Sequence, residues 1–169
     1  MARAWTIGVE ELTEEAFAPY GRIVAVPPAP APRSGPGWDC WFGFQALECP
    51  SPLLFGAVVT KPREIAVSEM ERHVDTFELL YPHGHALIQP LALPLDMDDP
   101  DARPDPSTVK AFRIPVGMGI IMHPGTWHSA AFPEAEETTY SFACMQPDPS
   151  YIPEWVRFTD DDAVTVTRS

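Results

Sequence analysis

Short runs of alternating apolar and polar residues recur along the whole chain, with turn residues between them. Side chains of a strand point alternately to its two faces, so such runs predict strands with one face in a core. About ten short strands are predicted from such runs or from short apolar runs between turns, within residues 5–9, 22–26, 38–47, 53–60, 64–73, 77–81, 86–93, 108–114, 120–122, 129–132 and 138–145, with 151–158 as a closing strand or helix. So many short strands predict an all-β sandwich or barrel.

Helical signals are confined to one short segment after the first strand. Thr13 is a suitable N-cap, and acidic residues follow it in the first turn. Pro19 and Gly21 then end the predicted helix after about two turns.

The segments between the strands carry turn and loop signals. Residues 29–37 are rich in Pro and Gly, which predicts a surface loop or lid. The sequence Pro-His-Gly-His at 82–85 predicts a β-hairpin between the strands on either side of it. Pro90 lacks an N–H, so its strand is expected to lie at an edge or to be bulged. The tail from residue 160 is expected to be loosely held.

The composition agrees with a single barrel-like domain over residues 1–169. The hydrophobic content of 45% is sufficient for one core, and 21 Pro with 10 Gly disfavour long helices. The net charge is −13, which disfavours binding to nucleic acid or to anionic membranes. An anionic substrate would therefore need a local positive charge in its site.

The cysteines and the N-terminus predict a cytoplasmic protein. Cys40, Cys49 and Cys144 match neither a zinc spacing nor a disulfide framework, which favours reduced thiols. The first ten residues lack the apolar core of a signal peptide. No stretch approaches the roughly 20 apolar residues that a membrane helix requires.

Candidate chemistry is concentrated in residues 71–78, Glu-Arg-His-Val-Asp-Thr-Phe-Glu. Glu71 and His73 share one face of an extended strand. Glu78 rejoins that face if a turn or bulge intervenes. His128 belongs to another predicted strand, and we expect these four side chains to meet in one pocket. Imidazole with carboxylate favours Zn, Mn, Fe or Ni over Ca; the alternative is four unrelated surface residues.

Other residues offer competing interpretations. His83 and His85, with Gln89 four residues on, also have metal-ligand spacing, but they lie on a Gly turn and lack a carboxylate. Arg72 is either a fork for a substrate carboxylate or a surface ion-pair partner. Tyr140 either presents its hydroxyl to the pocket or packs in the core. Weaker candidates for anion binding are Lys110 and Arg113.

The spacing Glu71-x-His73-x4-Glu78, followed far downstream by His128, resembles the cupin pattern. Glu71 stands where that pattern has its first histidine. The segments 11–21, 70–73, 105–112 and 119–128 resemble the ureidoglycolate lyase family, within a resemblance that covers about residues 7–145.

This resemblance implies a cupin-like double-stranded β-barrel (jelly roll) with one or two short helices, often dimeric. It also implies an enzyme that splits ureidoglycolate into glyoxylate and urea during purine (allantoin) breakdown. The positions that match the family pocket are Glu71, Arg72, His73, Glu78, His123 and His128.

Two departures from the family fall in the expected pocket. Glu78 replaces an amide with a charge, and Ser129 stands where a second histidine usually follows His128. These departures leave the substrate open, and they bring the pocket closer to that of a metal-binding cupin.

Three functions are therefore in competition. The first is a carbon–nitrogen lyase with Glu78 or His128 as the base and His73 as the acid, and with Arg72, His123 and Tyr140 on the substrate. The second is a metal-dependent cupin isomerase or dioxygenase, with one divalent ion (Zn, Mn, Fe or Ni) on Glu71, His73, Glu78 and His128. The third is a non-catalytic module that binds a small molecule. Exposed sheet edges predict a homodimer.

Overall fold

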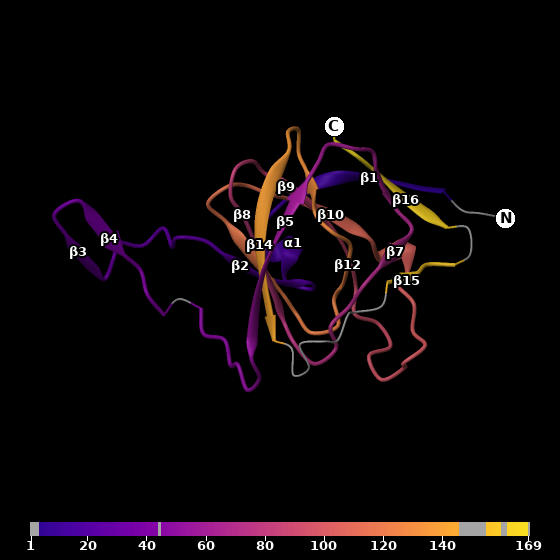
Figure 1. Ribbon diagram of the computed structural model, residues 1–169, viewed down its shortest axis with the longest axis horizontal. Helices are drawn as coiled ribbons and strands as arrows, with labels where there is room; N and C mark the ends of the chain where they lie inside the picture. Colours follow the sequence, from indigo (N-terminus) through magenta and orange to yellow (C-terminus); the bar gives the residue numbers. More distant parts are fainter. Residues whose placement is uncertain (1–3, 44, 146–154, 160–161, 169) are drawn as a thin grey trace.

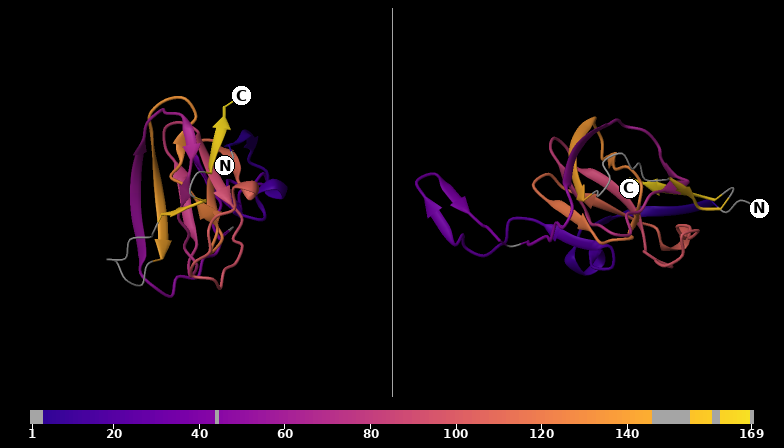
Figure 2. Two further views of the ribbon diagram at one scale, coloured as in Figure 1. Left: turned by 90° about the vertical axis from the view of Figure 1, so that its right-hand side faces the viewer. Right: turned by 60° about the horizontal axis from the view of Figure 1, so that its bottom comes forward.

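The computed structural model describes residues 4–43, 45–145, 155–159 and 162–168. Two sheets face each other and curl into a barrel (Figure 1; Figure 2). The first sheet has the order β12 (Trp127–His128), β9 (Leu87–Ala92), β10 (Lys110–Ile114), β1 (Ala4–Glu11), β16 (Ala163–Thr167) and β6 (Ile65–Val67), with β13 (Phe132–Pro133) also on β9. The second has the order β2 (Gly21–Val24), β11 (Gly119–Met122), β8 (Glu78–Pro82), β14 (Thr138–Met145) and β5 (Leu53–Thr60).

Two small ribbons and two short helical turns complete the described structure. They are β15 (Val156–Arg157) with β7 (Glu69–Met70), β3 (Arg33–Gly35) with β4 (Trp38–Cys40), α1 (Glu14–Phe17) and the 3-10 turn η1 (Pro106–Thr108).

The chain passes repeatedly between the two sheets. β8 belongs to the second sheet, β9 and β10 to the first, β11 to the second, β12 and β13 to the first, and β14 to the second. Pairing is antiparallel except at β1, which runs parallel to both β10 and β16. This is the cupin-like double-stranded β-barrel that the sequence predicted, with one short helix.

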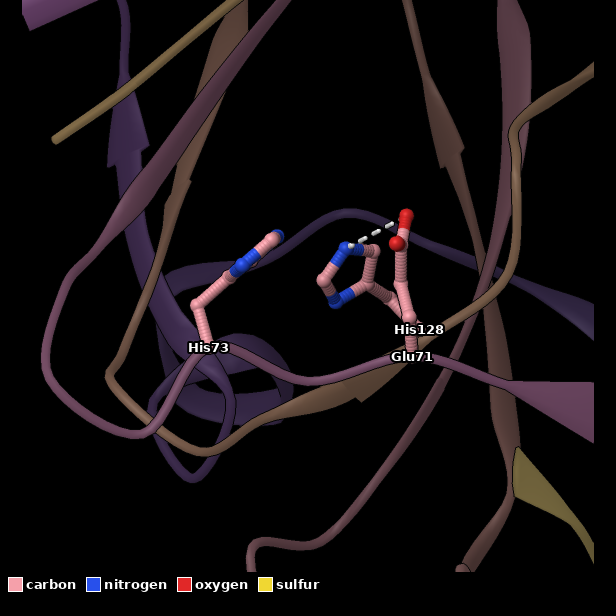
Figure 3. A group of neighbouring side chains, drawn as sticks. All are labelled: Glu71, His73 and His128. Atoms are coloured by element: carbon pink, nitrogen blue, oxygen red, sulfur yellow. Dashed lines mark ion pairs between the residues drawn. The ribbon is translucent and has the colours of Figure 1, made fainter. Parts of the chain in front are cut away.

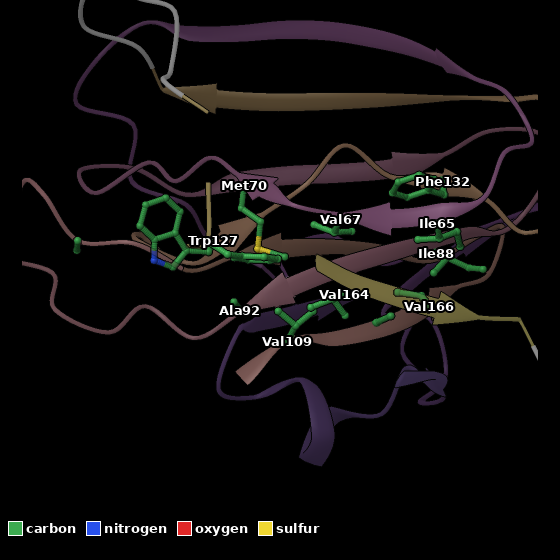
Figure 4. Close-up of a cluster of buried hydrophobic side chains, with 13 residues drawn as sticks. Ile65, Val67, Met70, Ile88, Ala92, Val109, Trp127, Phe132, Val164 and Val166 are labelled. Carbon is green, nitrogen blue, oxygen red and sulfur yellow. The ribbon is translucent and has the colours of Figure 1, made fainter. Parts of the chain in front are cut away.

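All six residues of β9 are buried, because the strand lies between two hydrophobic clusters. Ile88 and Ala92 belong to the cluster shown in Figure 4. Leu87 and Leu91, on the opposite face, belong to a second cluster that includes Phe112. Both faces of β9 are therefore covered, which explains its nearly continuous apolar sequence.

Several predicted elements are confirmed. β5 and β14 have the predicted bounds. Thr13 caps α1 through its Oγ1, which accepts a hydrogen bond from Ala16 N at 3.2 Å. The strand that contains Pro90 was expected to be an edge or a bulged strand, but β9 runs unbroken through Pro90 between β10 and β12. The irregularity lies in its partner, where β12 ends at His128 and β13 begins at Phe132, opposite Pro90.

The predicted β-hairpin around 82–85 is wrong. β8 pairs with β11 and β14, whereas β9 pairs with β10, β12 and β13 in the other sheet. The segment 82–85 therefore crosses between the sheets. A local turn signal gives no information about which partners the flanking strands will take.

The prediction of a loosely held tail is wrong for Ala163–Thr167. These residues form β16, which lies between β1 and β6. Val164 and Val166 alternate into the core, so this short sequence has the period of a half-buried strand. Of the predicted element at 151–158, residues 151–154 lie outside the described part of the chain.

The N-terminal excursion also differs from the prediction. The strand expected over 38–47 ends at Cys40, and β3 lies inside the segment 29–37 expected to be a loop. Together β3 and β4 form a hairpin that extends away from the barrel (Figure 1; Figure 2, right).

Candidate metal and active site

Backbone pairing between distant segments brings the candidate residues together. Glu71 follows β7 directly and forms a bridge with His128, through two backbone hydrogen bonds of 2.9 Å. The turn before His128 is held by Gly125, whose φ of 79° favours glycine and whose N–H donates to His73 O at 2.7 Å. Residues 69–73 and 123–128 are therefore fixed against each other.

Four side chains converge on one point, as the sequence predicted. His73 Nε2 lies 2.9 Å from Glu78 Oε2. His128 Nε2 lies 3.5 Å from Glu78 Oε2 and 3.6 Å from Glu71 Oε1. The two imidazole rings are 5.3 Å apart between centroids, and Figure 3 shows them beside Glu71. Glu78 reaches the group because bends at Val74 and Asp75 separate it from His73.

The surroundings of His128 fix its orientation. Its side chain is almost fully buried, and Nδ1 lies 3.0 Å from the carbonyl oxygen of Thr126. A carbonyl only accepts, so Nδ1 carries a hydrogen and donates it. Nε2 is buried and has no hydrogen-bond partner among the described residues. One ring nitrogen is thus anchored, and the other faces the carboxylates.

Neighbouring charges in the site shift the pKa values of Glu78 and His128, so that both are held in their charged forms. Burial by itself would lower the pKa of His128, but the carboxylates of Glu78 and Glu71 raise it to about 9. Burial would raise the pKa of Glu78, but His128 and His73 lower it to about 2. Burial raises the pKa of Glu71, with a further contribution from Glu78. At neutral pH the metal-free site therefore holds a carboxylate at Glu78 and an imidazolium at His128.

The residues present fit a divalent metal ion. A carboxylate oxygen of Glu71 and one ring nitrogen each of His73 and His128 lie within 4.8 Å of one another. Tetrahedral bonds of about 2.0–2.1 Å place ligand atoms roughly 3.4 Å apart, close to the separations measured from His128 Nε2. A metal-binding histidine commonly donates its other N–H to a backbone carbonyl, as His128 does to Thr126. The unpartnered Nε2 is then the ligand atom.

A cavity of about 390 Å³ adjoins this group. Its volume suits a small molecule. Most of the described wall is apolar, and the polar groups are concentrated at Glu71, His73, Glu78 and His128. The remaining lining residues are Leu54, Phe55, Val58, Leu80, Gln89, Ser129, Ala130, Tyr140, Phe142, Cys144 and Trp155. The described wall contains neither Lys nor Arg.

Tyr140 lines the cavity, which is the functional one of its two predicted placements. Its hydroxyl oxygen accepts a hydrogen bond from Ala131 N at 3.3 Å. Burial, above all, raises the pKa of Tyr140 to about 12, so the phenol keeps its proton at neutral pH.

The structure does not bring Arg72 or His123 to the described cavity wall. Arg72 donates to the carbonyl oxygens of Leu95, Asp96 and Asp99, and its guanidinium lies 4.6 Å from the centre of the Trp127 ring. His123 contributes a backbone N–H to the carbonyl of Tyr20. Contact of either side chain with substrate remains a prediction.

The other candidates from the sequence also lie elsewhere. His83 bonds to Ser141 Oγ at 2.7 Å, and His85 lies 3.6 Å from the exposed Glu136. Lys110 pairs with Glu10, and Arg113 pairs with Glu134. None of these four side chains lines the described cavity.

Gln89 is a cavity residue whose place the sequence did not indicate. It is fully buried, and its Nε2 donates to the carbonyls of Pro90 and Ser129. The available signal was a single amide inside the apolar run of β9, where a polar side chain needs a specific reason.

Comparison with known proteins adds little to this site. No family model matches the chain, and no curated protein sequence matches it. Among solved structures, it is similar to the sugar 3,4-ketoisomerase QdtA from Thermoanaerobacterium thermosaccharolyticum, in complex with TDP. The two share 12% identity and a TM-score of 0.43, over 63% of this chain and 67% of that one.

Strand order and side-chain geometry thus define the class: a cupin-like β-barrel protein with a buried Glu/His/His group that can bind a metal. The three cysteines are free thiols. The described helices include none with the length and apolar character needed to cross a membrane.

Proposed function

We propose that this protein is a metal-dependent enzyme of the cupin type. Glu71, His73 and His128 would hold one divalent ion, with Zn, Mn, Fe and Ni as the candidates. The observation that carries the proposal is the buried Nε2 of His128, which makes no hydrogen bond among the described residues and lies 3.5 Å and 3.6 Å from the carboxylate oxygens of Glu78 and Glu71.

The chain's own residues supply the proton chemistry. When bound, the ion would supply a Lewis acid that polarises a substrate oxygen. Glu78 is ionised at neutral pH and accepts a proton from the substrate. His73 Nε2 lies 2.9 Å from that carboxylate and positions it beside the proposed ion site. Tyr140 stays protonated and can donate its hydroxyl hydrogen to a substrate oxygen.

The cavity also limits the substrate class. A wall that is mostly apolar suits a small molecule with an apolar portion and one polar end. The described wall has neither Lys nor Arg, so a substrate carboxylate would need the charge of the ion. An isomerase or a dioxygenase acting on such a small molecule fits these limits.

Metal stoichiometry tests the proposal. The purified protein is stripped with EDTA, and Mn²⁺, Zn²⁺, Fe²⁺ or Ni²⁺ is titrated in by calorimetry. We expect one ion per chain for the wild type and none for His128→Ala. His85→Ala, which changes a histidine away from the cavity, is the matched control and should bind as the wild type does. Failure of the wild type to bind any of these ions would refute the proposal.

Ureidoglycolate cleavage is the second candidate function. The contact between His73 and Glu78 inside a small cavity favours it, because an acid and a base are needed together. Glu78 would remove the hydroxyl proton as the carbonyl of glyoxylate forms and the carbon–nitrogen bond breaks. His73 would protonate the departing urea nitrogen. Arg72 lies away from the cavity, so the ion would have to hold the carboxylate.

Glyoxylate release distinguishes this second candidate. The metal-loaded protein is incubated with ureidoglycolate, and glyoxylate is measured against spontaneous breakdown. We expect release above that background, absent in Glu78→Gln. A wild-type rate equal to the background would remove the lyase and leave the metal-dependent proposal standing.

A further inference from the structure

Residues 27–52, which we call the arm, leave the barrel after β2 and return to it at β5. The arm carries the β3–β4 hairpin, which extends well beyond the barrel (Figure 1; Figure 2, right). None of its described residues is buried. Trp38 and Phe42 are 54% and 62% exposed. A two-stranded hairpin standing alone in water is marginally stable at best.

The side-chain hydrogen bonds and the ring contact of the arm's described residues lie within the arm. Trp41 Nε1 donates to Ala29 O, and Arg33 lies 5.0 Å from the centre of the Phe42 ring. β3 pairs with β4 and with no other described strand. Nothing described in the barrel therefore accounts for the position of the hairpin or for its aromatic side chains.

β5 presents a second surface of the same character. It ends its sheet, so one edge of its eight residues has no strand partner in the described chain. Phe55 and Val59 are 74% and 59% exposed on its outer face. A long, apolar and unpaired edge strand is a ready site for association. Phe55 also lines the cavity, so whatever covers β5 borders the candidate active site.

The distribution of charge indicates which molecule covers the arm and β5. The protein has a net charge of −13, so two copies repel each other over most of their surfaces. The arm has only three charged residues, Arg33, Asp39 and Glu48, and β5 has none. The arm is sparsely charged and β5 is uncharged, and both expose apolar side chains on a strongly acidic chain, so each is suited to the other.

We infer that the protein is a two-fold dimer in which the arm of each copy packs across β5 of the other. Two-fold symmetry makes the contact twice, so a single arm–strand contact is sufficient to close the assembly. Each arm then covers Phe55 and Val59 of its partner and completes the cavity wall beside Phe55. This inference does not depend on metal binding.

Molecular mass in solution tests the inference. Light scattering coupled to gel filtration should give twice the chain mass of 18.7 kDa for the wild type. Val59→Lys on β5 and Trp38→Glu on the arm should each weaken the dimer about 30-fold or more, as expected for loss of a hot-spot contact. Val116→Lys is the matched control, because Val116 is equally apolar and 51% exposed but lies outside both surfaces.

Mixing the two variants sharpens the test. In a mixed dimer, one contact joins an unaltered arm to an unaltered β5, and the other contact carries both substitutions, whose new side chains have opposite charges. We expect the mixture of Val59→Lys and Trp38→Glu to recover dimer that neither variant forms alone. Slowed hydrogen exchange along β5 in the wild type, lost in Trp38→Glu, should accompany it. Trp38 has no core contact, so its variant should keep its fold.

Two results would overturn the inference. One is a wild-type protein that remains monomeric at tens of micromolar, the concentration range of the experiment. The other is a dimer that both Val59→Lys and Trp38→Glu leave intact, which would place the interface elsewhere.

Discussion

The pocket and the arm are opposite cases within one chain. The pocket residues are held by paired backbone segments and by partners on every side: His128 alone is fixed by Thr126, by Glu78 and by its bridge to Glu71. The arm has exposed aromatic side chains and no buried residue among those described. Contacts within one chain explain the conformation of the pocket, but they do not explain that of the arm. The comparison shows that a region lacking a core of its own points to a partner.

Loss of His128 should have the largest effect. His128→Ala removes a metal ligand, and we expect metal affinity to fall by more than about 100-fold, beyond the 10–100-fold range of outer-shell changes. The dimer should be unchanged, because His128 lies in neither the arm nor β5. Calorimetry and light scattering on the same sample check both points. Parallel loss of metal and dimer would mean that the two regions are coupled.

The barrel core should be almost as sensitive. Phe112 is fully buried and packs edge-on against Phe17 with ring centroids 5.3 Å apart. Phe112→Ala should lower the free energy of unfolding by about 3–5 kcal/mol, through lost burial and the cavity left behind. Urea denaturation of the metal-free protein measures this. A loss below about 1 kcal/mol would contradict the packing described.

The pH dependence of stability should identify the charges in the pocket. The pKa of His128 is raised from 6.5 to about 9, so its contribution is complete below pH 6.5 and is lost as pH rises through about 9. The pKa of Glu78 is lowered from 4.5 to about 2, so its contribution is present above pH 4.5 and is lost as pH falls through about 2. The two contributions overlap between about pH 4.5 and 6.5.

Melting temperatures in EDTA across the pH range check this expectation. In Glu78→Gln the melting temperature should fall less at acid pH, because the carboxylate is absent. It should also fall less at alkaline pH, because His128 then lacks its main partner. An alkaline loss of the same size in Glu78→Gln and in the wild type would be inconsistent with the pairing of these two residues.

The smallest effect on the monomer should come from the arm. At protein concentrations below the dimer dissociation constant, Trp38→Ala should change the free energy of unfolding by no more than about 0.5 kcal/mol, as for a surface substitution. At higher concentration the wild type alone should gain stability from association. A large loss in dilute solution would show that the arm packs on its own barrel.

The local features of this protein could be predicted because they depend on neighbours in sequence. β5 is a short apolar and β-branched run, β14 is rich in residues that favour strands, and Thr13 has the chemistry of an N-cap. The convergence of Glu71, His73, Glu78 and His128 could also be predicted, because residue types and spacing limit the possible ligand sets. The crossing at 82–85 and the strand at Ala163–Thr167 could not, because each depends on which distant strand supplies the partner.

The sequence by itself determined the alternation of strands, the short capped helix, the acidic charge and the residues that can bind a metal, since these follow from side-chain chemistry and period. Only the tertiary structure decided that Arg72 lies away from the cavity, that Gln89 lines it, and that β16 lies between β1 and β6. The physical reason is that burial and strand pairing are properties of segments brought together from far apart, and one side chain faces inward or outward only after its neighbours in space are chosen.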